Sequence, residues 1–230
     1  MIAVIVPAHN EAGGIARCLS SIRQAATHPA LAGEAVLTVV ALDDCVDDTA
    51  AHCRLPGVVS IELAARCVGV ARARAAELAL AMGARWIAST DADSQVPADW
   101  LAAQLGAGSE AFCGMVGVED WLDYPEPVQR AFGQGHRLRD GHRHVHGANL
   151  GISARLYRAC GGFAPMACGE DVALIDAVAA AGHPIAWHAR PLVLTSARRH
   201  ARAPGGFSRF LRQLECQAGA GLCAQPGAGG

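Results

Sequence analysis

The sequence lacks the features that would place it among membrane, exported or disulfide-linked proteins. It contains no run of about 18 apolar residues, so no membrane-spanning helix is expected. No basic segment precedes the apolar run at its start, and Pro7 interrupts that run, so no signal peptide is expected. The nine cysteines are scattered, odd in number and never spaced as Cys-x-x-Cys. This pattern favours reduced thiols, and we expect a cytoplasmic protein.

Charge is also scarce. Charged residues make up 17% of the chain and hydrophobic residues 52%, a balance typical of a folded core rather than of a disordered chain. The formal net charge of −2 gives no general attraction to nucleic acid or to anionic membranes. A length of 230 residues suits one domain.

Short apolar runs alternate with longer helical patterns along the chain. Strands are expected at residues 2–6, 36–42, 86–90, 112–118, 184–188 and 192–195. Helices are expected at residues 14–26, 69–82, 97–105, 153–160 and 170–181. Strands that are apolar on both faces and separated by helices are typical of a mostly parallel sheet flanked by helices. The sequence therefore predicts an α/β domain over residues 1–205, followed by a C-terminal helix or loose tail at 206–230.

Acidic and polar clusters follow three of the expected strands. The first strand leads into Pro7-Ala8-His9-Asn10-Glu11, the second into Asp43-Asp44, and the third into Asp91-Ala92-Asp93. In open α/β sheets, ligands bind beyond the carboxyl ends of the strands. Carboxylates gathered there repel one another unless a cation or a ligand's hydrogen-bond donors compensate. The alternative is that these residues only cap helices.

Asp91 and Asp93 stand one residue apart, directly after an apolar strand. Two carboxylates in that arrangement can converge on one hard cation. Mg²⁺ and Mn²⁺ favour oxygen ligands, and Mg²⁺ often completes its shell with phosphate oxygens. The pair therefore predicts Mg²⁺ or Mn²⁺ as cofactor.

Five motifs in this order resemble family 2 glycosyltransferases of the GT-A fold. They are Val4 to Glu11, Asp43-Asp44, Asp91-Ala92-Asp93, Gly147-Ala148-Asn149-Leu150-Gly151 and Gly169-Glu170-Asp171, and the resemblance covers roughly residues 1–200. It implies a single nucleotide-binding GT-A domain and a metal-dependent, inverting glycosyltransferase of the hexosyltransferase type. The substrates implied are a nucleotide-diphosphate sugar and an acceptor hydroxyl.

The resemblance also implies roles for individual residues. The donor nucleotide would contact Pro7, Ala8, His9, Glu11, Asp44, Asp91 and Arg72 or its neighbour Arg74. The sugar or acceptor pocket would include His146, Gly147 and Asn149. The metal would be held by Asp91 and Asp93, and the catalytic pair would be Glu170 and Asp171, with Asp171 as the base.

The proposed base also has support from its chemistry. A sugar hydroxyl is a poor nucleophile near neutral pH, and a carboxylate within hydrogen-bond reach can accept its proton. The alternative is that Asp171 caps the helix that follows.

Two positions depart from the family pattern. Cys45-Val46 follows the two aspartates where the family usually has Gly-Ser. Thr195-Ser196 stands about where many relatives carry a metal-binding histidine, with His200 slightly later.

Two further clusters have open interpretations. Four of the ten histidines fall within residues 136–146, and His142, His144 and His146 alternate, so on a strand they would share one side. They are either zinc ligands or, as we favour, solvated or substrate-facing side chains. Another cluster comprises Arg198, Arg199, Arg202 and Arg209. It is either a lid over the donor diphosphate or a solvated basic surface.

Other function classes fit the sequence less well. A nucleotidyltransferase of related fold would need a Gly-rich loop with a basic residue after the first strand. A dinucleotide-dependent oxidoreductase would need G-x-G-x-x-G there, and neither is present. A catalytically inactive nucleotide-sugar-binding protein is the remaining alternative, against which the combination of Asp91, Asp93 and Asp171 argues.

Overall fold

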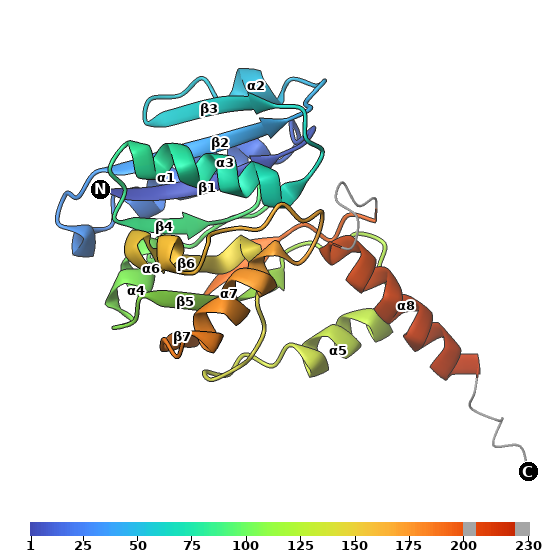
Figure 1. Ribbon diagram of the computed structural model, residues 1–230. Coiled ribbons are helices and arrows are strands. Elements are labelled where there is room, and N and C mark those ends of the chain that lie inside the picture. Colours follow the sequence, from blue (N-terminus) through green and yellow to red (C-terminus); the bar gives the residue numbers. More distant parts are fainter. Residues whose placement is uncertain (200–205, 224–230) are drawn as a thin grey trace, which may run out of the picture.

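Seven strands form one sheet in the computed structural model, which describes residues 1–199 and 206–223. The strand order is β3-β2-β1-β4-β6-β5-β7, and only β6 runs antiparallel to its neighbours among these strands. The bounds are β1 Ile2–Ala8, β2 Val36–Asp43, β3 Val58–Leu63, β4 Trp86–Ser89, β5 Ala111–Val118, β6 Leu150–Ser153 and β7 Ile185–Thr195. Figure 1 shows β1, β2 and β4 with their carboxyl ends at the same side of the molecule.

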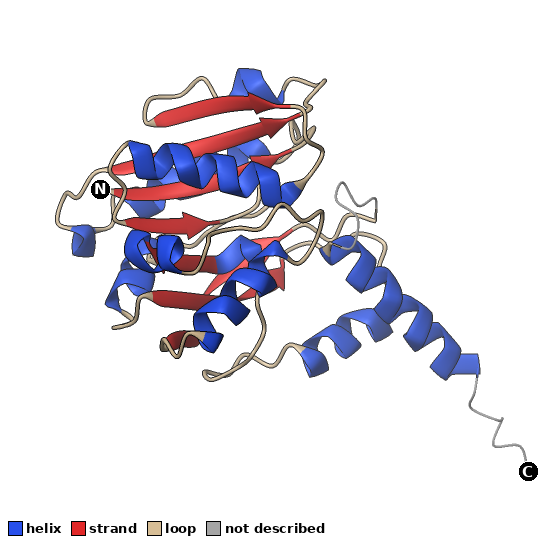
Figure 2. Cartoon of the chain, in the orientation of Figure 1, coloured by secondary structure: helices blue, strands red, loops and turns tan. Residues whose placement is uncertain are grey.

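Helices cover both faces of this sheet (Figure 2). Their bounds are α1 Ile15–Ala26, α2 Thr49–His52, α3 Val68–Ala81, α4 Trp100–Gly106, α5 Glu126–Gly135, α6 Ala154–Ala159, α7 Glu170–Ala180 and α8 Phe207–Cys223. Two short 3₁₀ helices, η1 Pro29–Leu31 and η2 Gly147–Asn149, complete the set in the described residues. The α/β architecture expected from the sequence is confirmed.

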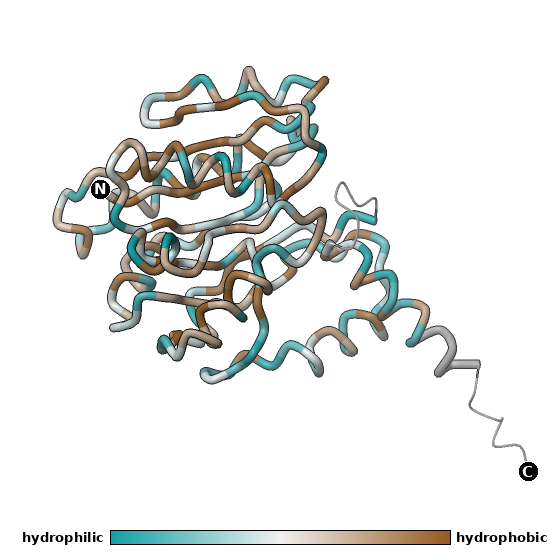
Figure 3. Tube along the Cα trace, viewed as in Figure 1, coloured by the Kyte–Doolittle hydropathy of each residue, from teal (hydrophilic) through white to brown (hydrophobic). Residues whose placement is uncertain are grey.

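The strands are buried on both faces because each face has its own core. Ile2, Val4 and Val6 of β1 pack with α1 and α4 on one face, whereas Ala3 and Ile5 pack with α3, α6 and α7 on the other. Residues along a strand point alternately to opposite faces. Continuous burial of β1 therefore requires an uninterrupted apolar run, and hydrophobic residues concentrate along the central strands in Figure 3.

A smaller third cluster lies beyond the sheet, where α5 and α8 pack together (Figure 1). Its buried members are Tyr124, Val128, Phe132, Ala197 and Leu211. The cluster joins the loop after β7 to both helices. It thereby holds α5 and the start of α8 at the carboxyl side of the sheet.

Three differences from the expected elements have physical causes. β3 was not expected because it is an edge strand in which partly buried and exposed residues mix. β6 has only four residues, too few to show a period. The two strands expected at 184–188 and 192–195 are one edge strand, β7, which contains Pro191. A proline is tolerated on an edge strand, and the pairing with β5 shifts register between Gly114 and Val116.

Asn149 connects three elements of the core. Its amide nitrogen donates to the carbonyls of Met115 (2.8 Å) and Pro191 (2.9 Å), and its oxygen accepts from the indole nitrogen of Trp100 (2.9 Å). A Cβ atom on Gly114 would lie 2.2 Å from that amide nitrogen, so this position must be glycine. The fully buried Asn149 therefore fastens β5, β7 and α4 together.

We expect Asn149→Ala to lower the free energy of unfolding by at least about 2 kcal/mol, because each buried group left unpaired costs about 1–3 kcal/mol. Urea unfolding followed by circular dichroism measures the change. The exposed Gln213→Ala is the control and should unfold like the wild type. An unchanged midpoint in Asn149→Ala would contradict this assignment.

Candidate active site

A cavity of about 580 Å³ lies at the carboxyl side of the sheet. Its walls come from the segments that follow β1, β2, β4 and β7 and from the starts of α3, α7 and α8. The described residues lining it include Pro7, Ala8, His9, Glu11, Arg72, Asp91, Asp93, His146, Gly147, Glu170 and Asp171. Of the residues expected at the site, the described lining omits only Asp44, Asn149 and the alternative Arg74.

The loops after β1 and β2 are bound to each other beside this cavity. Cys45, at the position where the family usually has glycine, donates from its thiol to the carbonyl of Ala8 and accepts from the backbone N–H of Asn10, both at 3.4 Å. The Asn10 side chain in turn accepts from the N–H of Val46 at 2.8 Å. The departure from the family pattern thus provides a thiol that contributes to this loop pairing.

Asp43, rather than its neighbour Asp44, lines the cavity. The buried Asp43 carboxylate accepts backbone hydrogen bonds from Ala65 (2.7 Å), Arg66 (2.9 Å) and Cys67 (2.8 Å), the residues that lead into α3. Asp44 has a left-handed backbone (φ 53°), and its carboxylate pairs with the exposed Arg66 side chain at 2.7 Å. The structure therefore does not bring Asp44 to the place expected for a nucleotide contact.

Arg72 is a buried cation at the centre of the site. Its guanidinium pairs with Glu170 at the start of α7 and, at 2.5 Å, with Asp91 after β4. Its Nε donates to the hydroxyl of Ser89 at 3.2 Å. A Cβ atom on Gly147 would lie 2.4 Å from the guanidinium, so the glycine makes room for it.

Arg74, the alternative to Arg72, is exposed and pairs with Glu77 on the same helix at 2.7 Å. Of the two arginines, Arg72 is therefore the one that belongs to the cavity.

Asp91 and Asp93 lie on the same wall, each beside an arginine. Burial is the main cause that raises the pKa of Asp91, opposed by Arg72, and burial likewise raises the pKa of Asp93, opposed by Arg198. Arg198 lies 3.2 Å from Asp93 and forms a two-pronged pair with Glu11, both contacts at 2.8 Å. The raised pKa values mean that the arginines only partly offset the burial of the two carboxylates.

Asp171 faces the cavity from the first turn of α7. One of its oxygens accepts from the backbone N–H of Gly147 at 2.6 Å and the other from the N–H of Val172 at 2.8 Å. The N-cap residue of α7 is Gly169, with φ 79°, so Asp171 does not occupy the capping position considered above. Glu170 is almost fully buried, and its carboxylate is engaged by Arg72.

The arginine cluster, whose role the sequence left open, lies only partly at the cavity. Arg198 lines the cavity, whereas Arg199 binds Asp123 and Glu215, and the cavity lining formed by described residues does not include Arg209. Arg202 and His200 lie outside the described residues. Thr195 and Ser196 also line the cavity, at the place where relatives carry a histidine.

Among the histidines, His136 and His146 line the cavity and lie close to His144. Burial and the neighbouring His144 lower the pKa of His136 to about 4. Burial, followed by the neighbouring imidazoles, lowers the pKa of His146 to about 3. These rings are therefore uncharged near neutral pH.

Several cavity residues were not expected from the sequence. They are Asp43, Arg66, His136, Cys168, Phe207 and Phe210. Asp43 carried a signal, because it belongs to the acidic pair after β2. The aromatic residues of α8 carried none, because only the packing of α8 against α5 brings them to the sheet.

Comparison with known proteins identifies the class. The family model described as "Glycosyl transferase family 2" matches residues 3–156. Comparison with curated proteins finds no match. In the described residues, no helix combines the length and apolar character needed to cross a membrane.

Solved structures agree in fold. S. aureus TarS 1-349 in complex with UDP-GlcNAc has a TM-score of 0.66 and 13% identity, covering 97% of this chain and 66% of that one. Another TarS 1-349 structure has a TM-score of 0.63 and 13% identity, covering 85% and 60%. The mannosyltransferase PcManGT from Pyrobaculum calidifontis, in complex with GDP-Man and Mn²⁺, has a TM-score of 0.62 and 20% identity, covering 100% and 76%.

The fold is thus that of GT-A glycosyltransferases. The chain belongs to glycosyl transferase family 2, since the family model covers more than half of it. The family resemblance is confirmed, and four of its five motifs lie within the matched residues, whereas Gly169-Glu170-Asp171 lies beyond them. The chain spans 60–66% of the length of the TarS 1-349 structures that it matches.

We expect Arg72→Met to destabilise the fold by about 3–5 kcal/mol, because it leaves the buried Glu170 without its cation. Adding Glu170→Gln should return part of the loss, so that the double variant differs from the sum of the single variants by about 0.5–3 kcal/mol. Urea unfolding of all four proteins gives this coupling.

The exposed pair Arg74 and Glu77 on the same helix provides the matched control cycle. Its coupling should stay below about 1 kcal/mol, as for other surface pairs. Equal couplings in the two cycles would contradict the central role of Arg72.

Proposed function

We propose that the protein is a metal-dependent inverting glycosyltransferase that moves a sugar from a nucleotide-diphosphate sugar to an acceptor hydroxyl. The observation that carries the proposal is one cavity lined by Asp91, Asp93 and Asp171. Asp91 and Asp93 follow β4, whereas Asp171 comes from the start of α7, far along the sequence. Their meeting in one cavity fits a reaction with a charged leaving group on one side and a proton to remove on the other.

The donor half is formed by the first hundred residues. Pro7 and Ala8 end β1, His9 follows that strand, and Asp43 ends β2, so this wall suits the nucleoside. The similar structures of TarS with UDP-GlcNAc and of PcManGT with GDP-Man support a nucleotide sugar as donor. Arg198 lies near enough to the acidic wall to offer a guanidinium to diphosphate oxygens.

The residues present fit a divalent cation. Asp91 and Asp93 offer hard oxygen ligands. Arg72 is shared between Asp91 and Glu170, and Arg198 between Asp93 and Glu11, so the carboxylates outnumber the guanidinium groups. The side chains of Asp91 and Asp93 would hold Mg²⁺ or Mn²⁺, which, when bound, would neutralise charge on the departing diphosphate. The PcManGT structure with Mn²⁺ supports this proposal.

Asp171 suits the role of general base. The N–H groups of Gly147 and Val172 fix the orientation of its carboxylate, and each oxygen keeps a second acceptor site for an acceptor hydroxyl. Inversion requires attack on the anomeric carbon from the side opposite the diphosphate. The proton must then leave on the acceptor side, away from the carboxylates of Asp91 and Asp93. The buried Glu170 positions Arg72 and is not expected to touch the acceptor.

The metal dependence predicts how nucleotide binding responds to Asp93→Asn. Calorimetry should show tighter binding of UDP or GDP to the wild type in Mn²⁺ than in EDTA, and the variant should lose that difference while it still folds. The matched control is Asp99→Asn, an exposed aspartate six residues further along the chain, which should bind as the wild type does. Equal binding by the wild type in Mn²⁺ and EDTA would exclude the proposed cofactor role.

The base assignment predicts the effect of Asp171→Asn. The amide keeps an oxygen for a backbone N–H but cannot take a proton, and loss of a general base costs about 10²–10⁴ in rate. Transfer from a nucleotide sugar should fall by that factor, whereas donor affinity and melting temperature stay near wild type. Asp176→Asn on the exposed face of α7 serves as the control. Wild-type transfer by Asp171→Asn would remove Asp171 from the mechanism.

A further inference from the structure

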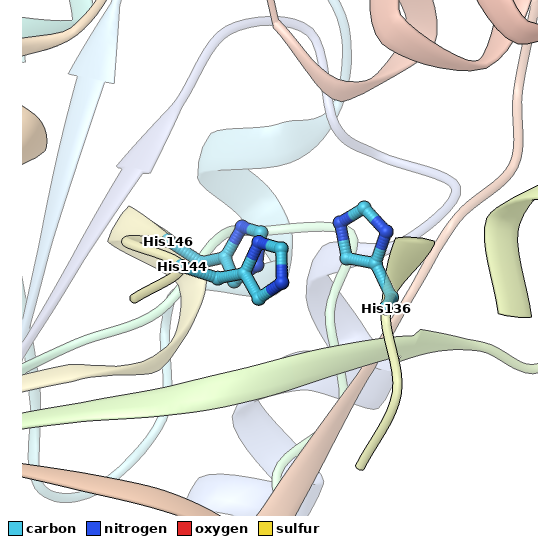
Figure 4. A group of neighbouring side chains, drawn as sticks. All are labelled: His136, His144 and His146. Carbon is cyan, nitrogen blue, oxygen red and sulfur yellow. The ribbon is translucent and has the colours of Figure 1, made fainter. Parts of the chain in front are cut away.

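Three imidazoles gather on one wall of the cavity. One nitrogen from each of His136, His144 and His146 lies within 4.8 Å of the other two. His136 directly follows α5, whereas His144 and His146 lie in the segment that leads into η2. Figure 4 shows His144 and His146 side by side, facing His136 across a gap.

Two of these rings carry buried nitrogens that lack a hydrogen-bond partner. Within the described residues, Nδ1 of His136 and Nε2 of His146 are buried and unpaired. Buried polar atoms are normally satisfied by protein or bound groups, so two unpaired nitrogens at one place point to a ligand. The interpretation favoured from the sequence was solvated or substrate-facing side chains, and the unpaired buried nitrogens argue against the solvated one.

Aromatic side chains pack around these rings. His136 stacks on Phe132 with ring centroids 4.3 Å apart, and Phe210 of α8 lies against it at 5.2 Å. On its other face, His136 stacks with His144 at 4.6 Å. The aromatic wall keeps the group at the border of the cavity, which His136 and His146 line.

We propose that His136, His144 and His146 form a binding site for a divalent metal ion of the zinc type. Imidazole nitrogens suit Zn²⁺, and three histidines with a further open position are an established zinc arrangement. Mg²⁺ and Mn²⁺ prefer oxygen ligands, so this site is chemically distinct from Asp91 and Asp93.

Binding of a metal ion would require the rings to reorient. Zn–N distances of about 2.0–2.1 Å in a tetrahedral site place ligand nitrogens about 3.3 Å apart. The rings now lie within 4.8 Å and nearly parallel, so each must rotate for its lone pair to reach a common centre. The terminal torsion of histidine is broad, which permits that rotation.

His142, the remaining histidine of this segment, takes another role. Its Nε2 donates to the carbonyl of His188 at 3.1 Å, and its Nδ1 accepts from the backbone N–H of His144 at 3.2 Å. These bonds use both of its nitrogens and fix the chain ahead of His144. The ion would therefore connect the end of α5 to a segment already anchored on β7.

The test uses the full chain without an affinity tag and Zn²⁺ alone, with no nucleotide. Titration against a chromophoric zinc chelator should give one ion per chain, and a large excess of Mg²⁺ should not displace it. His136→Gln and His144→Gln should each weaken binding by about 100-fold or more, because loss of an outer-shell partner alone costs 10–100-fold.

Two controls separate this site from other zinc ligands. His52→Gln removes an exposed histidine on α2, and Cys168→Ser removes a thiol that lines the same cavity. Both variants should bind Zn²⁺ as the wild type does. Loss of binding in Cys168→Ser, or wild-type affinity in both histidine variants, would overturn the proposal.

A measurement on the wild type covers the case in which the variants do not fold. Co²⁺ bound in place of Zn²⁺ should give the visible absorption of a four- or five-coordinate nitrogen and oxygen site, without a thiolate charge-transfer band. A thiolate band, or no binding of either metal, would overturn the site. Because no nucleotide is used, either result leaves the proposed transferase function to be judged by its own experiments.

Discussion

The site depends on a single buried guanidinium. Arg72 projects from α3 between Asp91, at the end of β4, and Glu170, at the start of α7. Without a cation there, these carboxylates and Asp171 would repel one another. The arginine therefore lets Asp91, which follows β4, share one cavity with Glu170 and Asp171, which both belong to α7. Its bulk explains why the neighbouring position must be Gly147.

A second arginine likewise lies between carboxylates from different elements. Arg198, which follows β7, joins Glu11 after β1 to Asp93 after β4. The carboxyl ends of these strands are thus connected by charge as well as by the sheet. Asp91 and Asp93, the carboxylates expected to bind metal, each lie beside an arginine. Binding of a metal ion there would therefore be coupled to the positions of Arg72 and Arg198.

The sequence predicts the sheet and most of the cavity because parallel strands bring their carboxyl ends together. It does not predict which side chain of a motif faces the ligand. Asp43 lines the cavity and Asp44 does not, because a left-handed backbone at Asp44 turns its carboxylate to Arg66. Asn149 belongs to one of the family motifs, yet its side chain makes three hydrogen bonds within the core. Such outcomes depend on long-range packing, which motif spacing does not contain.

The family match includes some residues of the cavity lining and leaves out others. The family match ends at residue 156, so it includes the donor wall with Asp91 and Asp93. Asp171, Arg198 and Phe207 line the cavity from beyond that range. The histidine cluster is completed by packing against α8, which also lies beyond it. The family match therefore covers Asp91, Asp93, His146 and Gly147 of the cavity lining, whereas the lining residues of α7, of the segment after β7 and of α8 lie beyond it.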